Sequence, residues 1–592
     1  MKKEIQKIIA EALKMMQDEK ILSAFDFKEI RVDLNSRLQF GHYSSNIAFV
    51  LSKRLNKSVD EIASIIIKNI EGLDEGQYFE KIEVKNGFLN FFLSSKILFK
   101  NFRKILKQKT NYGSRPINNK KVAVFDYSSP NIAKPFGIGH LRSTIVGYSL
   151  YTLYKFLGWH AVGDNHLGDW GTQFGKLIYQ LKTKVLVDKT PKEQKQILSQ
   201  ITIQDLEKLY IDFHREAEQN PLLEEEGRKW FAALEQGDKE ARRLWKFCVQ
   251  VSMKEFDRIY GLLGVKFDYV LSESFYENKL KNVLKELQVK KLVTPSEGAL
   301  IFDFSPLSLP PALVLKSDGA TTYFLRDLTA LKYRLDHFKP KLIVYEVGMD
   351  QKLYFEQLFE AAQRLGWLNG VKLVHVAHGL VRWPEGKFST RKGLTIHLEE
   401  VLEEAQKKAL AIIKASATGR GFSLKQQKLV AQKVGIGAIK YNFLSYHYAS
   451  DIIFDWERIL NLDGNSGPYL QYTLARCFSI LDKGAKIKQD KRYSVNLSND
   501  KFLIHPLELT LLSLFVKFED ILEEASEQFA PHLICNFAFQ LAEEYNRFYQ
   551  ELPILKAATP EAQGFRLQLT MATNYLLQIC FSLLGLEVLK KM

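Results

Sequence analysis

Apolar and polar positions alternate differently in successive parts of the chain. In its first 110 residues, two short apolar runs, 82–84 and 88–93, flank the pair Asn86-Gly87. An Asn-Gly pair between apolar runs predicts a β-hairpin, because both residues accept the backbone conformation of a tight turn. Most other positions there have the spacing of amphipathic helices. We therefore expect an α+β domain over residues 1–112.

From Lys121 to about Thr395, short apolar runs alternate with helical patterns. This alternation predicts an α/β domain with a parallel sheet and right-handed crossovers over residues 113–395. Within it, about residues 186–260 are charged and rich in Glu, Lys and Gln, which indicates inserted helices. The runs that would form the strands are 122–125, 299–302, 342–347 and 373–377.

After His397 the pattern is helical to the end of the chain, interrupted only by loops. Long amphipathic stretches at 502–528 and 531–549 predict an all-α region. We expect a helical connector over residues 396–464 and an all-α domain over residues 465–592.

Composition narrows the class of protein. The 592 residues are 46% hydrophobic, and no run of about 18 apolar residues indicates a membrane span. The first residues have the pattern of an amphipathic helix rather than a signal peptide. The four cysteines form no C-x-x-C pair, which argues against a zinc site and a disulfide framework and suits a reducing cytoplasm. The net charge of +15 lies before residue 465 and suits a polyanionic partner.

The most informative stretch is residues 131–144, a Gly-containing turn between the apolar run 122–125 and a helical pattern. A turn of this kind binds phosphate, because free N–H groups and the positive end of the helix dipole face it. Gly137 and Gly139 let a flat ligand such as adenine approach the backbone. Lys134 and His140 would add a positive charge and a donor. The alternative is a tight strand–helix connection with His140 as a polar cap.

A second basic stretch follows the last apolar run of the α/β region. Residues 386–393 have glycine at both ends and contain Lys387, Ser389, Arg391 and Lys392. Taken alone, such a stretch is most often a solvated surface loop. Its position after a phosphate-binding turn on the first strand is more informative than either stretch alone.

The order of these two motifs resembles the signature motifs of class I aminoacyl-tRNA synthetases. Residues 165–175, Asn-His-Leu-Gly-Asp-Trp-Gly-Thr-Gln-Phe-Gly, narrow the resemblance to the arginyl-tRNA synthetases, as do Ser317-Asp318-Gly319, Tyr323, Arg326 and Asp327. The resemblance runs from about residue 35 to the end. It implies a Rossmann-type catalytic domain, an N-terminal domain that contacts the tRNA elbow, and a C-terminal anticodon-binding bundle.

The same resemblance implies the reaction. An arginine–tRNA ligase converts L-arginine and ATP, with Mg²⁺, to arginyl-adenylate. It then transfers arginine to the 2′-hydroxyl of the 3′-terminal adenosine of tRNA(Arg). The attack of a carboxylate on phosphorus needs positioning and positive charge rather than a protein base. We expect no zinc and no other protein-ligated metal, no membrane partner, a cytoplasmic location and a monomer.

The chain departs from the family pattern at two places. Thr390 and Arg391 stand where the basic loop usually has Lys and Ser, so the second lysine is missing. By the same resemblance, arginyl enzymes that lack this lysine often carry one just before the phosphate turn, and Lys134 would be that lysine. Gly137 stands where the turn usually has its first histidine. Loss of that donor costs about 1–3 kcal/mol of transition-state stabilisation unless backbone or water replaces it.

The resemblance also assigns an arginine pocket. A buried guanidinium needs acceptors for five N–H donors, so carboxylates are expected. Asp327 and Glu273 would supply charge, and Tyr323 and Gln351 would supply stacking and further acceptors. Asn131 and His140 would hold the α-amino and carboxylate end. The alternatives are a surface helix cap for Asp327 and a solvated loop acid for Glu273.

Two further groups have open assignments. His166, Asp169 and Gln173 would face the adenosine or the tRNA end, or else pack around Trp170. By resemblance, anticodon bases would stack on and bond to side chains of the helical tail. These side chains are Tyr469, Gln471, Tyr472, Arg476 and Asn546. The alternative is that Tyr469 and Tyr472 are buried.

Two other functions remain compatible with the sequence. The first is a catalytically silent paralogue that binds tRNA as a regulatory or scaffold module, suggested by Gly137. The second is a class I enzyme for another amino acid. Asp327 and Glu273 disfavour it, because a neutral side chain would leave both carboxylates unpaired.

Overall fold

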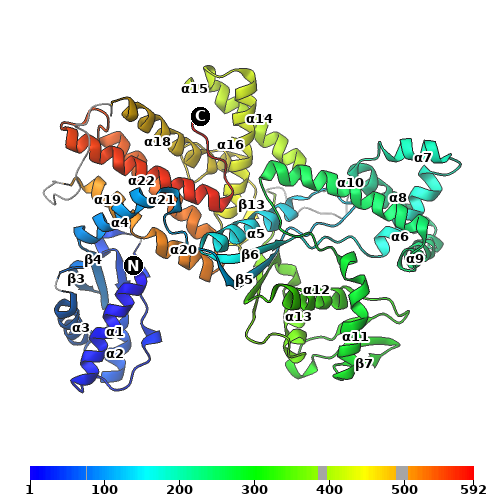
Figure 1. Ribbon diagram of the computed structural model, residues 1–592, viewed down its shortest axis with the longest axis horizontal. Coiled ribbons are helices and arrows are strands. Elements are labelled where there is room, and N and C mark those ends of the chain that lie inside the picture. Colours follow the sequence, from blue (N-terminus) through cyan, green and yellow to red (C-terminus); the bar gives the residue numbers. More distant parts are fainter. Residues whose placement is uncertain (36, 75, 384–396, 488–503) are drawn as a thin grey trace. The chain divides into compact units, whose positions relative to one another are not determined.

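The computed structural model describes residues 1–592 except 36, 75, 384–396 and 488–503 (Figure 1). The predicted loop residues Lys387, Ser389, Arg391 and Lys392 lie outside the described residues. The chain forms two compact units. One contains Met1–Ser114, Leu462–Ser582 and Val588–Met592, and the other contains Arg115–Asn461 and Leu583–Glu587.

A four-stranded parallel sheet forms the centre of the second unit, in the order β11-β10-β5-β6. Strands β5 and β10 contain continuous apolar runs at 122–125 and 342–345, as expected where both faces of a sheet are covered. The predicted parallel sheet and α/β fold class are confirmed. The strands are β5 (Asn118–Asp126), β6 (Trp159–Asp164), β10 (Leu342–Gly348) and β11 (Lys372–His378).

The prediction for residues 299–302 as a strand of this sheet is wrong. They form β8 in a separate antiparallel sheet, β7-β8-β9. Glu297 and Gly298 have φ values of 48° and 80°, so a tight turn folds the run back on its neighbour. The three strands are β7 (Val293–Ser296), β8 (Ala299–Phe302) and β9 (Ala312–Leu315).

Strand β6, which the sequence pattern did not indicate, takes the remaining place in the parallel sheet. His160 and Gly163 interrupt its apolar character. Gly163 is needed because a Cβ there would lie 2.9 Å from the hydroxyl oxygen of Tyr127. A strand that makes room for a neighbouring aromatic side chain therefore loses the apolar run by which strands are recognised.

Helices connect the strands of this unit. Between β5 and β6 runs α5, and α12 and α13 lie on either side of β10 in the sequence (Figure 1). In the region between β6 and β7, α6 packs so closely on α9 that a Cβ on Gly175 would lie 1.9 Å from the carbonyl oxygen of Gly227. The helices are α5 (Ile138–Phe156), α6 (Thr172–Gln180), α7 (Pro191–Leu198), α8 (Ile203–Gln219), α9 (Leu222–Glu235), α10 (Lys239–Leu263), α11 (Leu280–Val289), α12 (Tyr323–Phe338) and α13 (Lys352–Arg364).

After β11, the two-residue strands β12 (Val381–Arg382) and β13 (Ile452–Ile453) pair in parallel. The buried guanidinium of Arg142, on α5, donates to the carbonyl oxygens of Gly379 at 2.7 Å, Tyr448 at 2.9 Å and Ser450 at 2.6 Å. Arg142 thus fixes α5 to the segments that flank both short strands. The intervening helices are α14 (Leu398–Ala415), α15 (Ala417–Arg420) and α16 (Leu424–Leu444), and α17 (Trp456–Ile459) follows β13.

The first unit begins with an α+β region. Its antiparallel sheet has the order β1-β2-β4-β3, and the predicted hairpin is present, with Asn86 and Gly87 at φ values of 50° and 77°. The predicted helix at the start of the chain is α1. The elements are α1 (Lys2–Asp18), β1 (Asp33–Leu34), β2 (Tyr43–Ser45), α2 (Ile47–Leu55), α3 (Val59–Asp74), β3 (Phe79–Lys85), β4 (Phe88–Leu93) and α4 (Ser95–Gln108).

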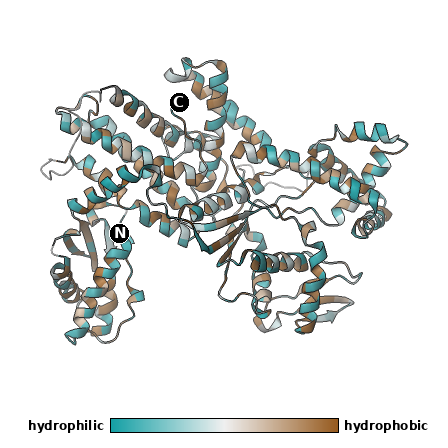
Figure 2. Cartoon of the chain, viewed as in Figure 1, coloured by the Kyte–Doolittle hydropathy of each residue, from teal (hydrophilic) through white to brown (hydrophobic). Residues whose placement is uncertain are grey.

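Helices of the chain's last part complete this unit. Figure 2 shows hydrophobic and hydrophilic residues alternating along them, as in helices that bury one face. The stretch 502–528, predicted as one helix, instead contains α19 and α20 with a break at Val516 and Lys517. The helices are α18 (Gly467–Ile487), α19 (Pro506–Phe515), α20 (Phe518–Glu527), α21 (His532–Glu551) and α22 (Pro560–Leu584).

Helix α22 is long and apolar enough to cross a membrane by length and composition, although the sequence pattern did not indicate such a segment. In the folded chain, 72% of its most apolar window is buried inside the protein. That burial is what the core helix of a bundle shows.

Candidate active site

A cavity of about 860 Å³ lies at the carboxyl ends of β5, β10 and β11. In parallel α/β sheets this edge is where ligands bind, because the loops and helix N-termini that follow the strands converge there. The structure brings together at this cavity the predicted residues Asn131, Gly137, Gly139, His140, Glu273, Tyr323, Asp327 and Gln351, and also His166.

The turn between β5 and α5 has an unusual backbone. Ser128, Ser129 and Ala133 have φ values of 76°, 46° and 63°, a conformation that costs about 1–3 kcal/mol at each non-glycine residue. Neighbouring segments hold it by hydrogen bonds. The Ser129 N–H donates to Oδ1 of Asn165 at 3.1 Å, and the Ile132 N–H donates to the carbonyl oxygen of Gly168, also at 3.1 Å. The turn is therefore held in shape before any ligand binds.

Helix α5 begins at this turn with Gly137 as its N-cap. The Gly137 N–H donates to Nδ1 of His140 at 3.2 Å, so the ring hydrogen of a neutral His140 is on Nε2. Burial, together with the charges of Lys134 and His378, lowers the pKa of His140 to about 4. His140 is thus a neutral donor at pH 7. A Cβ on Gly139 would meet no atom within 4 Å, which leaves room for a ligand at the helix start.

Lys134 is not among the residues that line the cavity. Its ammonium lies 5.3 Å from the centre of the Tyr210 ring on α8. The predicted compensation by Lys134 for the missing loop lysine therefore stays a prediction.

The acidic side of the cavity is formed by α12. The Tyr354 hydroxyl donates to Oδ2 of Asp327, and Nε2 of His166 lies 3.3 Å from Oδ1. Asp327 lies within the first turns of the helix and not at its cap, so the alternative assignment as a cap is wrong. Tyr354 thus fixes Oδ2 of Asp327, and His166 lies within ion-pair distance of Oδ1.

Glu273 is buried rather than solvated, which excludes the alternative of a solvated loop acid. Its side chain is 9% exposed and lies 3.2 Å from Nη1 of Arg326. Burial raises its pKa to about 7, although the positive charges of His166 and Arg326 oppose that shift. The charge of Glu273 is therefore already shared with a neighbouring cation.

Sequence reasoning missed the ion cluster behind these acids. Arg334, 1% exposed, lies 2.8 Å from Oδ2 of Asp126 and 2.8 Å from Oδ2 of Asp164. The two aspartates end β5 and β6, so the cluster fixes α12 across the sheet edge. An arginine seven residues after Asp327 on one helix face was the available signal. It did not identify its partners, more than 160 residues earlier.

Comparison with known proteins decides the family. A family model described as "tRNA synthetases class I (R), catalytic domain" matches residues 101–456, more than half of the chain. The "Arginyl tRNA synthetase N terminal domain" matches residues 3–93, and the "DALR anticodon binding domain" matches residues 470–592. An arginine–tRNA ligase of Clostridioides difficile is 38% identical over 92% of each chain. The chain belongs to the arginyl-tRNA synthetase family.

Other relatives of this family agree. An arginine–tRNA ligase of Clostridium botulinum is 36% identical over 96% of this chain and 97% of its own. The crystal structure of arginyl-tRNA synthetase from Plasmodium falciparum has a TM-score of 0.81 at 27% identity, over 100% of this chain and 99% of that one. The Thermus thermophilus enzyme has the same fold, with a TM-score of 0.80 at 22% identity over all of both chains. The predicted family, fold class and activity of an arginine–tRNA ligase are confirmed.

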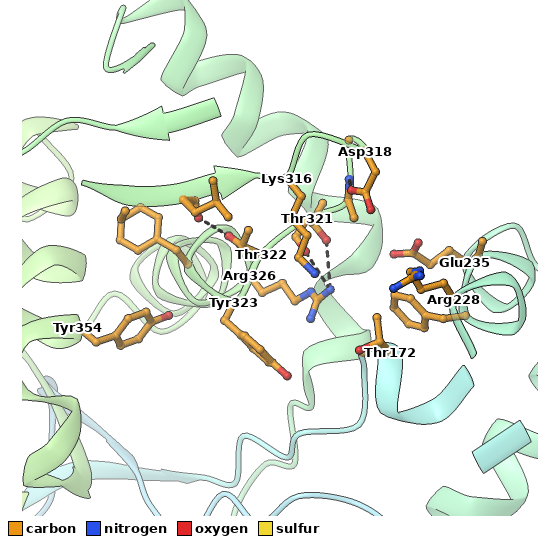
Figure 3. Close-up of a pocket in the computed structure, with 18 of the residues that line it drawn as sticks. Thr172, Arg228, Glu235, Lys316, Asp318, Thr321, Thr322, Tyr323, Arg326 and Tyr354 are labelled. Carbon is orange, nitrogen blue, oxygen red and sulfur yellow. Dashed lines mark hydrogen bonds between the residues drawn. The ribbon is translucent and has the colours of Figure 1, made fainter. Parts of the chain in front are cut away.

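Beside the active-site cavity of this synthetase lies a second cavity of about 790 Å³ (Figure 3). Tyr323 and Tyr354 line both cavities. In Figure 3, Arg228 and Glu235 lie across this cavity from Tyr354, and Arg326 lies between them, bonded to Thr321. The two cavities therefore share an aromatic wall.

The structure separates the three residues of the 165–175 motif that had open assignments. Asp169 is 3% exposed and accepts from the N–H and hydroxyl of Ser274 at 2.8 and 2.6 Å, so it has a packing role. Nε2 of Gln173 lies 3.5 Å from the carbonyl oxygen of Gly168. Only His166 of this set lines the active-site cavity.

The predicted anticodon residues belong to the other unit. Arg476 lies between two rings, 4.9 Å from the centre of Tyr472 and 4.7 Å from that of Tyr549, and donates to Asn546. Tyr472 is 44% exposed, whereas Gln471 is fully buried. Tyr469 is half-buried, 5.7 Å from the Phe539 ring. Tyr549, also exposed, was missed by sequence reasoning.

Within the described part of the chain, no group of three or more His, Cys, Asp or Glu side chains is placed to hold a metal ion.

Proposed function

We propose that the cavity at the carboxyl ends of β5, β10 and β11 activates L-arginine with ATP and passes it to the 2′-hydroxyl of the terminal adenosine of tRNA(Arg). The observation that carries this assignment is the arrangement of opposite charges. The N-terminus of α5, which attracts anions, and the carboxylate of Asp327, which attracts cations, line one cavity. The reaction requires arginine, whose side chain is a cation, and ATP, which is an anion, to bind next to each other.

In the proposed activation step, the arginine carboxylate attacks the α-phosphorus of ATP. A bond forms between carboxylate oxygen and phosphorus, and the bond from phosphorus to the departing pyrophosphate breaks. Mg²⁺ enters with ATP as part of the substrate. Nε2–H of His140 and the first N–H groups of α5 would stabilise the phosphate charge without moving a proton.

The guanidinium end would bind at Asp327, whose oxygens retain free lone pairs beside the bond from Tyr354 and the ion-pair contact with His166. Tyr323 and Gln351 would supply further acceptors, and Asn131 would hold the α-amino group. Lysine presents one ammonium instead of a planar fork, so it would leave acceptors unpaired. This difference is the proposed basis of selectivity.

For tRNA, we propose that anticodon bases stack on the exposed group of Tyr472, Arg476 and Tyr549, with Asn546 holding Arg476 in place. The buried Gln471 would support this surface from within. A cytoplasmic monomer that meets free tRNA suits this arrangement.

The test is aminoacylation of total tRNA with labelled arginine, lysine or glutamate in parallel, with ATP and Mg²⁺ present. The proposal expects charging with arginine alone. Charging with lysine or glutamate would assign the pocket to another amino acid. Bound tRNA with no charging by any of the three would support the silent paralogue instead.

A further inference from the structure

Nδ1 of His166 is hydrogen-bonded to a carbonyl oxygen, whereas Nε2 forms no hydrogen bond within the described part of the chain but lies within ion-pair distance of a carboxylate. Its Nδ1 lies 2.8 Å from the carbonyl oxygen of Leu271, and its Nε2 lies 3.3 Å from Oδ1 of Asp327. A neutral imidazole with its N–H on Nδ1 bonds the Leu271 carbonyl and leaves Nε2 without a proton, whereas the imidazolium also turns a positive charge toward the Asp327 carboxylate. The geometry of the pocket therefore favours a charged His166.

The surroundings of His166 are acidic. The guanidinium of Arg334, which opposes a positive charge on His166, is itself paired with Asp126 and Asp164, and that of Arg326 is paired with Glu273. Burial is the largest single influence and lowers the pKa of His166, but the Asp327 carboxylate and the charge of Asp126 together outweigh it and raise that pKa to about 9. The groups that face it are Asp126 on β5, Asp164 on β6, Asp169 on its own loop, Glu273 and Tyr276 after α10, and Asp327 and Arg334 on α12.

The imidazolium thus supplies, beside Asp327, the positive charge that a bound substrate cation would otherwise supply. Asp327 is also the carboxylate to which the proposed function assigns the guanidinium of arginine. A second positive charge bound to the same carboxylate disfavours the imidazolium and moves the pKa of His166 back toward its ordinary value of about 6.5. Nε2 of His166 is itself buried, and the active-site cavity that His166 lines is the route by which its proton would leave.

We propose that His166 is a positioning residue that holds Asp327 as a cation in the empty pocket and releases its Nε2 proton when arginine binds. The inference rests on the proposed arginine pocket. The guanidinium enters with its charge, and one proton leaves to the solvent, so the charge of the pocket is unchanged. The Nδ1 hydrogen remains on the Leu271 carbonyl. The freed Nε2 lone pair then accepts one of the five guanidinium N–H groups.

This exchange makes arginine binding depend on pH. Protons and arginine compete for the pocket between the pKa of His166 in the complex and its value of about 9 in the empty protein. Within that window the dissociation constant for arginine falls as pH rises, by at most about tenfold per pH unit. Above pH 9 His166 is already neutral, and the dependence disappears.

The experiment is titration calorimetry of the whole protein with L-arginine at pH 8, in phosphate and in Tris buffer. The two buffers differ in ionisation enthalpy, so the difference in heat counts released protons. At pH 8, Glu273, with a pKa of about 7, is almost fully charged and adds only about 0.1 proton. We expect release of roughly 0.6–0.9 proton per arginine bound.

Two variants separate His166 from other sources of protons. His166→Gln keeps a neutral donor near Asp327 but cannot titrate, so it should bind arginine with about 0.2 proton released or less. His160→Gln changes an exposed imidazole on β6 and should release as many protons as the unaltered protein.

The outcomes distinguish this inference from the function on which it rests. Arginine binding without proton release, or with the same release in His166→Gln, would overturn the role of His166 while leaving the pocket intact. Failure of the unaltered protein to bind arginine at millimolar concentration would overturn both. Should His166→Gln fail to fold, the unaltered protein decides the question. A dissociation constant that is flat from pH 7.5 to 9 would refute the exchange.

Discussion

Gly168 lies so close to Asn131 that a Cβ on the glycine would be 2.3 Å from Oδ1 of the asparagine. The two residues also pair as an isolated parallel bridge, with the Gly168 N–H donating to the carbonyl oxygen of Pro130 at 3.2 Å. The phosphate turn and the 165–175 motif are therefore joined at one glycine. This contact fixes where Asn131 faces the cavity.

Gly168→Ala should displace Asn131 and weaken arginine binding. Insertion of a methyl group into such a contact costs about 1–3 kcal/mol, which corresponds to a rise in KM for arginine of roughly 5- to 150-fold. Steady-state aminoacylation measures this rise. The matched control is Gly261→Ala on α10, where a Cβ meets no atom within 4 Å. Equal KM values for the two variants would contradict the proposed place of Asn131.

Gly137, where the family pattern usually has histidine, should accept a side chain without structural damage. A Cβ there would lie 3.6 Å from Nδ1 of His140, an ordinary contact. We expect Gly137→Ala to change the free energy of unfolding by less than about 1 kcal/mol. Gly137→His should raise kcat by roughly 5- to 100-fold if the new imidazole reaches the phosphates. Loss of the fold in Gly137→Ala would show that the turn requires glycine.

Arg334→Met should destabilise the catalytic unit strongly. It leaves the carboxylates of Asp126 and Asp164 buried with no cation beside them, a loss of about 3–5 kcal/mol. Urea unfolding, followed in the transition of that unit, measures the change. Arg215→Met removes an exposed pair with Asp212 and should cost about 0.5 kcal/mol or less. Similar midpoints for both variants would show that the cluster does not anchor α12.

Arg476→Ala should weaken tRNA binding without affecting arginine. The guanidinium holds Tyr472 and Tyr549 as one surface, and a stacked base contributes about 1–3 kcal/mol. The expected result is a KM for tRNA raised roughly 5- to 150-fold, with an unchanged KM for arginine. Arg547→Ala, an exposed pair with Glu551 on α21, is the control. A shift in the KM for arginine would place this surface in another role.

The limits of prediction from sequence follow from the range of the interactions involved. The hairpin at Asn86-Gly87 was predicted correctly because its turn depends on two adjacent residues. The run 299–302 was misplaced because a short apolar run fits a parallel or an antiparallel sheet equally well, and the turn at Gly298 decides between them. Strand β6 was missed because its packing against Tyr127 requires Gly163.

In the candidate site, too, features that depend on neighbouring residues were predicted, and features that depend on distant contacts were not. Asp327 and Glu273 were identified by resemblance to a family, through motifs that each span a few residues. Their partners could not be identified in this way. His166 reaches Asp327 across 161 positions of sequence, and Arg326 and Tyr354 acquire their roles only when α12 and its neighbours pack. Charge compensation in the pocket is a property of the folded chain.

The most direct test of the proposed pocket compares Asp327→Asn with Asp336→Asn in arginine charging of tRNA. Both aspartates are on α12, but Asp336 is 63% exposed and pairs with Lys332. Loss of a charged contact to the guanidinium should lower kcat/KM for arginine by roughly 10²–10³-fold in Asp327→Asn and leave Asp336→Asn within about twofold of the unaltered protein. Unchanged kcat/KM in Asp327→Asn would contradict the assignment of this cavity to arginine.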